Sequence, residues 1–177
     1  MKRFLLSILC ALWASFHVAA QELSALARVD ASASSIADGW WGRTDLTLRL
    51  SQGVPFRVFT LDDPARLVVD FREVDFDGLR SASLLGTTGR ISAVRFGAFQ
   101  PGWSRLVADL AEPMLPQEIG MPVDPNSGRA TLEISLKKVA PEVFAENSGA
   151  PIDPNWTPAF LRAPPPPRPG ADRFTVV

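Results

Sequence analysis

The sequence predicts an all-β protein, an antiparallel β-sandwich followed by a proline-rich linker. Seven or eight short segments alternate apolar and polar residues, which is the pattern of strands with one buried face. Turn-forming residues recur at close intervals, and almost no stretch has the 3.6-residue period of a helix. In addition, RLVVDF at residues 66–71 returns as RLVADL at residues 105–110. This repeat suggests a duplicated β unit.

The first twenty residues have the organisation of a secretory signal peptide. Lys2 and Arg3 form a positively charged start, residues 4–16 are almost entirely apolar, and small residues precede a cleavage site after Ala20. A membrane-spanning helix needs about twenty apolar residues, so this run is too short to serve as a stable membrane anchor. We therefore expect cleavage within an exported precursor, with Gln21 as the mature N-terminus.

The folded domain is predicted over residues 21–139, and its first half consists of strands joined by turns. Weak alternation over residues 21–36 is typical of an edge strand. Turn residues then surround Trp40 and Trp41, and one of these two indoles is expected in the core. Three further strands, expected to pair in sequence order as an antiparallel meander, are predicted at residues 44–50, 54–61 and 66–71.

The second half of the domain begins with one short helical turn, predicted within residues 77–85. Strands are then predicted at residues 91–99, 105–110, 114–121 and 130–138. In the repeated segments, alternation assigns to the core Leu67, Val69 and Phe71 of the first copy and Leu106, Ala108 and Leu110 of the second.

Proline dominates the sequence after the predicted domain. Nine of the 16 prolines lie between Pro141 and Pro169. Proline cannot donate to a sheet and favours extended polyproline geometry, so residues 140–170 are predicted to be a semi-rigid linker. Residues 171–177, which include RFTVV, are typical of the first strand of a further domain, which we expect to be truncated here.

The composition excludes several classes of function. Cys10 and His17 are the only cysteine and histidine, and both fall in the predicted signal peptide. The mature chain therefore lacks thiolate and imidazole groups for zinc binding or for a Ser-His-Asp triad, and we assign it no catalytic residues and no metal ligands. Removing Lys2 and Arg3 leaves 16 basic and 19 acidic residues, a net charge of about −3, which argues against nucleic-acid binding.

Two segments carry a resemblance to a known family. They are VFTLDDPARLVVDF at residues 58–71 and ISAVRFGAFQPGWSRLVADL at residues 91–110. Both resemble, in the same order, motifs of the AMIN domain, the N-terminal module of periplasmic N-acetylmuramoyl-L-alanine amidases. The resemblance covers residues 46–138. It implies a sandwich of two small, similar sheets, which agrees with the repeat.

The resemblance also implies a function. AMIN domains of this kind bind peptidoglycan and concentrate the amidase at the division septum, where it acts in cell-wall turnover and daughter-cell separation. It implies a periplasmic location, with division-site proteins as further candidate partners. The zinc ligands and catalytic glutamate of such amidases have no counterpart here, so zinc is expected only in the missing catalytic domain. The alternatives are an AMIN module of a pilus-type outer-membrane secretin, or a stand-alone module that binds cell wall or protein.

The candidate ligand-binding residues gather on the second predicted hairpin, which carries Arg95, Phe99, Trp103 and Arg105; Arg66 of the first copy is added to this set. An aromatic ring beside hydrogen-bond donors is the chemistry of sugar binding, because the ring packs on C–H faces and arginine bonds hydroxyls or carboxylates.

The same residues also allow a structural interpretation. Arg66 with Asp70 and Arg105 with Asp109 are four residues apart on one strand face, about 13 Å, which is too far for direct pairing. They can instead form cross-strand ion pairs that set the register. Phe99 and Trp103 can equally close the end of the hairpin and fill the core. If one of the two units binds a ligand, the sequence favours the second.

Overall fold

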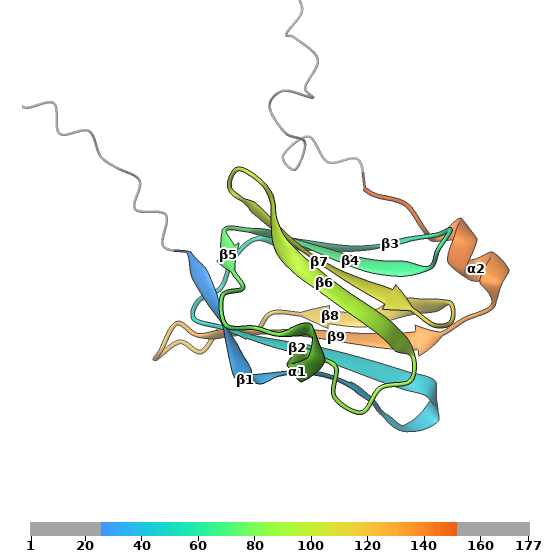
Figure 1. Cartoon of the computed structure of the whole chain (residues 1–177), viewed down its shortest axis with the longest axis horizontal. Helices are drawn as coiled ribbons and strands as arrows, with labels where there is room; N and C mark the ends of the chain where they lie inside the picture. Colours follow the sequence, from blue (N-terminus) through green and yellow to red (C-terminus); the bar gives the residue numbers. More distant parts are fainter. Residues whose placement is uncertain (1–25, 152–177) are drawn as a thin grey trace, which may run out of the picture.

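Two β-sheets packed face to face form the fold, which a computed structural model describes over residues 26–151 (Figure 1). The prediction of an all-β antiparallel sandwich is confirmed. The predicted signal peptide, residues 1–20, and the predicted start of a further domain, residues 171–177, lie outside the described residues.

The larger sheet contains five strands, β1 (Ala27–Asp38), β2 (Arg43–Leu50), β5 (Val74–Asp75), β8 (Met114–Gly120) and β9 (Ala130–Lys138). Their order across the sheet is β5-β1-β2-β9-β8. All neighbours are antiparallel except for the short parallel pairing of β1 with β5. The strand expected at the edge is β1. Its outer side is bordered only by the two-residue strand β5 and by an isolated bridge between Ile36 and Leu85.

The smaller sheet contains four strands, β3 (Phe56–Leu61), β4 (Arg66–Arg72), β6 (Ile91–Gln100) and β7 (Trp103–Leu110), in the order β3-β4-β7-β6. Both predicted hairpins, β3–β4 and β6–β7, are present. The two copies of the repeat are β4 and β7, which are antiparallel neighbours at the centre of this sheet. The repeat therefore builds one sheet, instead of contributing one unit to each sheet.

The predicted meander is wrong at the step from β2 to β3, because these strands lie in different sheets. Both edges of β2 are occupied, by β1 and β9, so β3 has no vacant edge to join. The chain crosses between the sheets over residues 51–55. There the Ser51 N–H donates to the Arg28 carbonyl, and the Pro55 carbonyl accepts from the Arg72 N–H.

The core lies between the sheets and consists of apolar side chains at alternating strand positions, as the sequence predicts. A fully buried Val, Leu, Ile or Phe side chain contributes about 1.5–3 kcal/mol. The central strands of both sheets supply Leu46, Leu48, Leu50, Leu67, Val69, Phe71, Leu106, Ala108, Leu110, Leu132, Ile134 and Leu136. At one end, Phe76 packs between Phe71 and Phe96, with ring centroids 6.0 and 5.1 Å apart.

Three short helical segments complete the fold, η1 (Trp40–Gly42), α1 (Ser81–Leu84) and α2 (Pro141–Glu146). Segment α1 lies inside the range predicted for a helical turn and buries Leu84 completely. Within residues 26–151, no helix has the length and apolar character needed to cross a membrane.

Helix α2 is part of the folded unit, although its residues fall in the range 140–170 assigned to the linker. Pro141 suits a first helical position, where its missing N–H costs no hydrogen bond. Phe144 is only 1 % exposed and belongs to the core, and the Gly149 N–H donates to the Thr60 carbonyl at 2.8 Å. Six helical residues are too few to show a helical period in a proline-rich sequence. The folded part thus extends past its predicted end.

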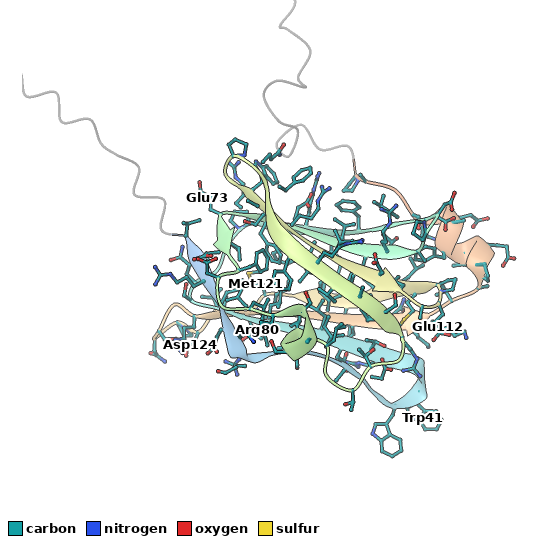
Figure 2. All side chains as sticks on the ribbon, in the orientation of Figure 1. Trp41, Glu73, Arg80, Glu112, Met121 and Asp124 are labelled. Carbon is teal, nitrogen blue, oxygen red and sulfur yellow. The ribbon has the colours of Figure 1, made fainter. Side chains whose placement is uncertain are left out.

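The expectation that Trp40 or Trp41 lies in the core is wrong, because their side chains are 86 % and 95 % exposed. They occupy a 3-10 turn between β1 and β2, where the alternation of a strand does not apply. Trp41 has φ 60° and ψ 30°, a left-handed conformation that is uncommon outside glycine. Figure 2 shows Trp41 pointing away from the sheets.

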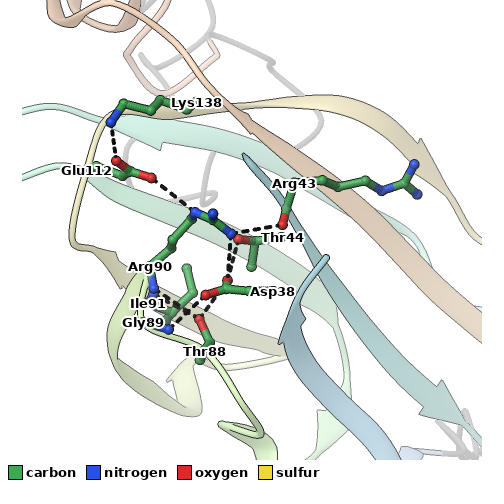
Figure 3. Close-up of polar contacts among 9 residues, drawn as sticks. All are labelled: Asp38, Arg43, Thr44, Thr88, Gly89, Arg90, Ile91, Glu112 and Lys138. Carbon is green, nitrogen blue, oxygen red and sulfur yellow. Dashed lines mark hydrogen bonds and ion pairs between the residues drawn. The ribbon is translucent and has the colours of Figure 1, made fainter. Parts of the chain in front are cut away.

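A polar network centred on Asp38 holds this turn against a neighbouring loop (Figure 3). The Asp38 carboxylate accepts hydrogen bonds from the hydroxyls of Thr44 at 2.7 Å and Thr88 at 3.0 Å, and from the Gly89 N–H at 2.8 Å. The Arg90 guanidinium lies 3.5 Å away. Burial by itself raises the pKa of Asp38, but these hydrogen bonds and the arginine charge outweigh it and hold the pKa below its usual value.

Replacing Phe144 by alanine should lower the free energy of unfolding by about 3–5 kcal/mol, because it removes a buried ring from the core. Urea unfolding of the full chain measures the change. Val143→Ala is the matched control: Val143 is on the same helix but 42 % exposed, and a surface change of this kind costs about 0.5 kcal/mol or less. Equal effects of the two substitutions would show that α2 does not stabilise the sandwich.

Asp38→Asn should destabilise the protein at about pH 6 and have much less effect at about pH 2.5. Because the pKa of Asp38 is lowered on folding, its carboxylate stabilises the fold above the unfolded pKa. That contribution is lost as the pH falls through the folded pKa. Urea midpoints of wild type and variant at both pH values test this. Asp77→Asn, at an exposed carboxylate, serves as control. An equal loss for Asp38→Asn at both pH values would contradict the charge-based explanation.

Candidate functional site

Charged and aromatic side chains collect on the outer surface of the four-stranded sheet. In β3, β4 and β7 the apolar positions point to the core, so period-two alternation directs the intervening residues outward. We call this surface the arginine face, and it comprises Arg57, Phe59, Arg66, Asp70, Arg72, Arg95, Phe99, Trp103, Arg105 and Asp109.

Asp70 is the centre of the arginine face. Its carboxylate is only 1 % exposed and lies opposite Arg57 on one neighbouring strand and Arg105 on the other. Arg105 binds it in a bidentate manner, from Nε to Oδ1 at 2.6 Å and from Nη2 to Oδ2 at 3.0 Å. Arg57 binds Oδ2 from Nη2 at 2.7 Å and from Nε at 2.9 Å. One buried negative charge thus has two positive partners, and the cluster keeps a net positive charge.

Two aromatic rings orient these guanidinium groups. The Arg105 Cζ lies 3.7 Å from the centroid of the Phe99 ring, and the Arg57 Cζ lies 5.3 Å from that of Phe59. Arginine stacks well on such rings because its guanidinium is planar and weakly hydrated. Phe99 is 48 % exposed, so part of this stacked pair remains open to solvent. The pair offers an apolar surface directly beside positive charge.

The five predicted ligand-binding residues do not form one compact group. Phe99 and Arg105 are in contact, whereas Arg95 lies four residues from Phe99 along β6 and pairs with Asp109. Trp103 is 7 % exposed and lies beneath the Arg72 guanidinium, whose Cζ is 4.9 Å from its ring centroid. Its ring is therefore not available for stacking from solvent, and it closes the end of the hairpin.

Arg66 lies at the other end of the arginine face. On β4, Arg66 pairs in register with Asp109, and Arg72 pairs with Trp103. Arg66 and Arg72 are six residues apart, which is roughly 20 Å along the strand. The Arg66 Nε donates to the Pro64 carbonyl at 3.1 Å. Asp109 instead pairs with Arg95, at 2.8 Å from Nη2 to Oδ1. A ligand that contacted Arg66 and Phe99 together would have to be extended.

Sequence reasoning missed Arg57, Phe59 and Arg72 as members of this face. The signal for the first two was present, because alternation in the segment PFRVF places Arg57 and Phe59 on the side opposite Phe56. Pairing the hairpin in register would have set Arg57 against Asp70. The cross-strand ion pairs proposed as the structural interpretation do occur, with Asp70 bonded to Arg105 and Asp109 bonded to Arg95.

A groove of about 860 Å³ adjoins the arginine face at the end of the β6–β7 hairpin. Its walls are mainly apolar, with carboxylates among the lining residues, which include Glu73, Asp75, Phe76, Phe96, Phe99 and Trp103. This volume is within the usual range of small-molecule sites. Because Phe99 belongs to both the groove and the stacked pair, a ligand there could touch the arginines as well.

The described residues do not offer a set of zinc donors. Residues 26–151 contain no histidine or cysteine, and no three carboxylates within that range lie close enough to hold a metal ion. The arrangement on the arginine face is suited to binding carboxylates and flat polar rings.

Comparison with known proteins places most of this fold in a family. The family model described as "AMIN domain" matches residues 37–143, which is more than half of the chain. A curated relative, the N-acetylmuramoyl-L-alanine amidase AmiC of Neisseria meningitidis serogroup B, is 35 % identical over 83 residues. That match covers 45 % of this chain and 20 % of the relative. The matched segment therefore spans about a fifth of the relative's length.

Asp70→Asn should lower the free energy of unfolding by about 3 kcal/mol, because it leaves two partly buried guanidinium groups without their counter-charge. Asp109→Asn is the matched control, since Asp109 is 24 % exposed and pairs with an Arg95 side chain that is 64 % exposed. Exposed pairs of this kind contribute about 1 kcal/mol or less. Urea unfolding measures both losses, provided that the slope of the unfolding free energy against urea concentration is the same in wild type and variants. If the two losses were equal, Asp70 would not be the anchor of the sheet.

Proposed function

The chain belongs to the AMIN domain family, and we propose that it is a peptidoglycan-binding module of an exported N-acetylmuramoyl-L-alanine amidase. The observation that carries this proposal is the arginine face, where Phe99 and Arg105 stack beside a groove. Peptidoglycan combines sugar rings with peptide stems that end in carboxylates. Arginine forms bidentate bonds with carboxylates, and aromatic rings pack on the C–H faces of sugars.

The domain organisation fits this role. We propose that residues 1–20 direct export, that the AMIN domain follows from residue 21, and that the proline-rich residues lead to a catalytic domain of which residues 171–177 are the start. The zinc ion and its ligands would belong to that domain, as would the catalytic chemistry. The match to an amidase supports this organisation. It also favours an amidase module over a module of a pilus-type secretin or a stand-alone module.

The proposed place of action is the periplasm, at the division septum. A module that binds the wall polymer would raise the local concentration of a tethered hydrolase near its substrate, because a linker converts the second encounter into an intramolecular one. Division-site proteins are further proposed partners, since the exposed ion pairs of the sheet surfaces also suit contacts with another protein.

Co-sedimentation of the purified chain with isolated sacculi tests the binding role. We expect the Arg95→Ala/Phe99→Ala double variant to bind at least about tenfold more weakly, because it removes a charged donor and an exposed ring. Arg129→Ala removes an exposed arginine at the opposite sheet and should leave binding unchanged. Urea midpoints close to that of wild type would show that both variants fold.

Two results would overturn the proposal. One is sedimentation of the wild type no greater than that of the heat-denatured chain. The other is equal binding by the wild type and by the double variant, which would remove the arginine face from the interaction.

A further inference from the structure

The β1–β2 turn exposes two indoles that the arginine face does not use. Trp40 and Trp41 are the most exposed of the large apolar side chains within residues 26–151, at 86 % and 95 %. Burying such rings ordinarily stabilises a protein, so leaving two adjacent indoles in water forgoes several kcal/mol of burial energy that a core position would provide. Exposed apolar surface of this kind marks a contact site.

Hydrogen bonds and ion pairs support the turn in this exposed conformation. The Gly39 N–H donates to the Arg43 carbonyl at 2.8 Å. The Arg90 Nη1 donates to the same carbonyl at 3.3 Å, as Figure 3 shows. Arg90 is itself fixed by Asp38 and by Glu112, whose carboxylate lies 3.2 Å from the Arg90 Nε. A left-handed backbone at Trp41 persists because these surrounding contacts determine it.

A groove begins at the two indoles and runs over the outer surface of the five-stranded sheet. Its first part has a volume of about 320 Å³ and is lined by Trp40, Trp41, Arg43, Gln117, Glu118 and Lys137 among others. A second part of about 490 Å³ shares Arg43, Glu118 and Ser135 with the first and continues past Thr47 and Glu133. The two parts form one elongated track, a shape that suits a linear polymer.

The lining of this track favours a saccharide. It supplies an amide at Gln117, a hydroxyl at Ser135, and charges of both signs, with Arg43 lying 2.6 Å from Asp45 and 3.7 Å from Glu118. Such balanced donors and acceptors match the hydroxyls of an uncharged sugar. An anionic membrane surface would instead require an excess of cations, because the carboxylates of the track would be repelled.

We propose that this track is a second binding site, for a linear uncharged oligosaccharide whose rings stack on Trp40 and Trp41. The inference rests on the proposed function only for the identity of the polymer. On that basis the Trp40–Trp41 turn and its track hold the glycan strand, while the arginine face meets the carboxylates of the peptide stems. Since the two sheets pack face to face, the two sites lie on opposite outer surfaces of the sandwich.

Calorimetric titration of the purified chain with a β-1,4-linked N-acetylglucosamine tetrasaccharide tests the site. We expect the wild type to bind and Trp40→Ala/Trp41→Ala to bind at least about tenfold more weakly, because a sugar loses its stacking surface. Trp40→Phe/Trp41→Phe should restore part of the affinity. The Arg129→Ala variant, at an exposed residue outside the track, should bind the tetrasaccharide as the wild type does. Unchanged urea midpoints would exclude misfolding.

No binding of the tetrasaccharide by the wild type, or equal binding by wild type and Trp40→Ala/Trp41→Ala, would overturn the inference. Tryptophan-dependent binding to phosphatidylglycerol vesicles without saccharide binding would also overturn it, in favour of a membrane surface. The two proposals fail separately. A chain that sediments with sacculi but ignores the tetrasaccharide refutes only this inference, whereas tetrasaccharide binding without sedimentation refutes only the proposed function.

Discussion

The buried carboxylate of Asp70 joins three of the four strands that carry the arginine face. It accepts from Arg57 on β3 and Arg105 on β7, and its own strand lies between them. A shift of one residue in this pairing would turn Asp70 into the core and Leu67 out to solvent, so the ion pairs and the apolar burial enforce the same register. Because the guanidinium of Arg105 also stacks on Phe99, the contact that sets the register also positions the proposed ligand surface.

The sandwich presents two outer surfaces with different chemistry. The four-stranded sheet concentrates arginines, of which several are held by carboxylates or aromatic rings, and it suits acidic and flat ligands. The five-stranded sheet balances acidic and basic side chains beside the exposed Trp40 and Trp41. A polymer that carries both sugars and carboxylates would meet complementary groups on either surface, and contact at two sites would increase the total affinity beyond that of either one.

Sequence reasoning succeeded where the signal was local. The strand at Ala130–Lys138 and both hairpins follow from alternation and turn residues within a few positions of one another. The arginines, phenylalanine and tryptophan of the second hairpin were found. Burial of Trp103 was one of the two alternatives that the sequence left open, because it depends on Arg72 from another strand. Helix α2 was missed because only the core explains it, through Phe144.

The sequence by itself determined the two hairpins and the inward residues of the strands at residues 44–50, 66–71, 105–110 and 130–138, because side-chain alternation and turn chemistry are properties of neighbouring residues. The family followed from the resemblance of two segments to its motifs. Only the tertiary structure decided that both copies of RLV(V/A)D lie in one sheet, that β3 leaves β2 for the other sheet, and that Trp40 and Trp41 are exposed. These outcomes depend on which strand edges are already occupied and on contacts between distant segments, such as that between Asp38 and Arg90. A pattern of neighbouring residues contains no information about either.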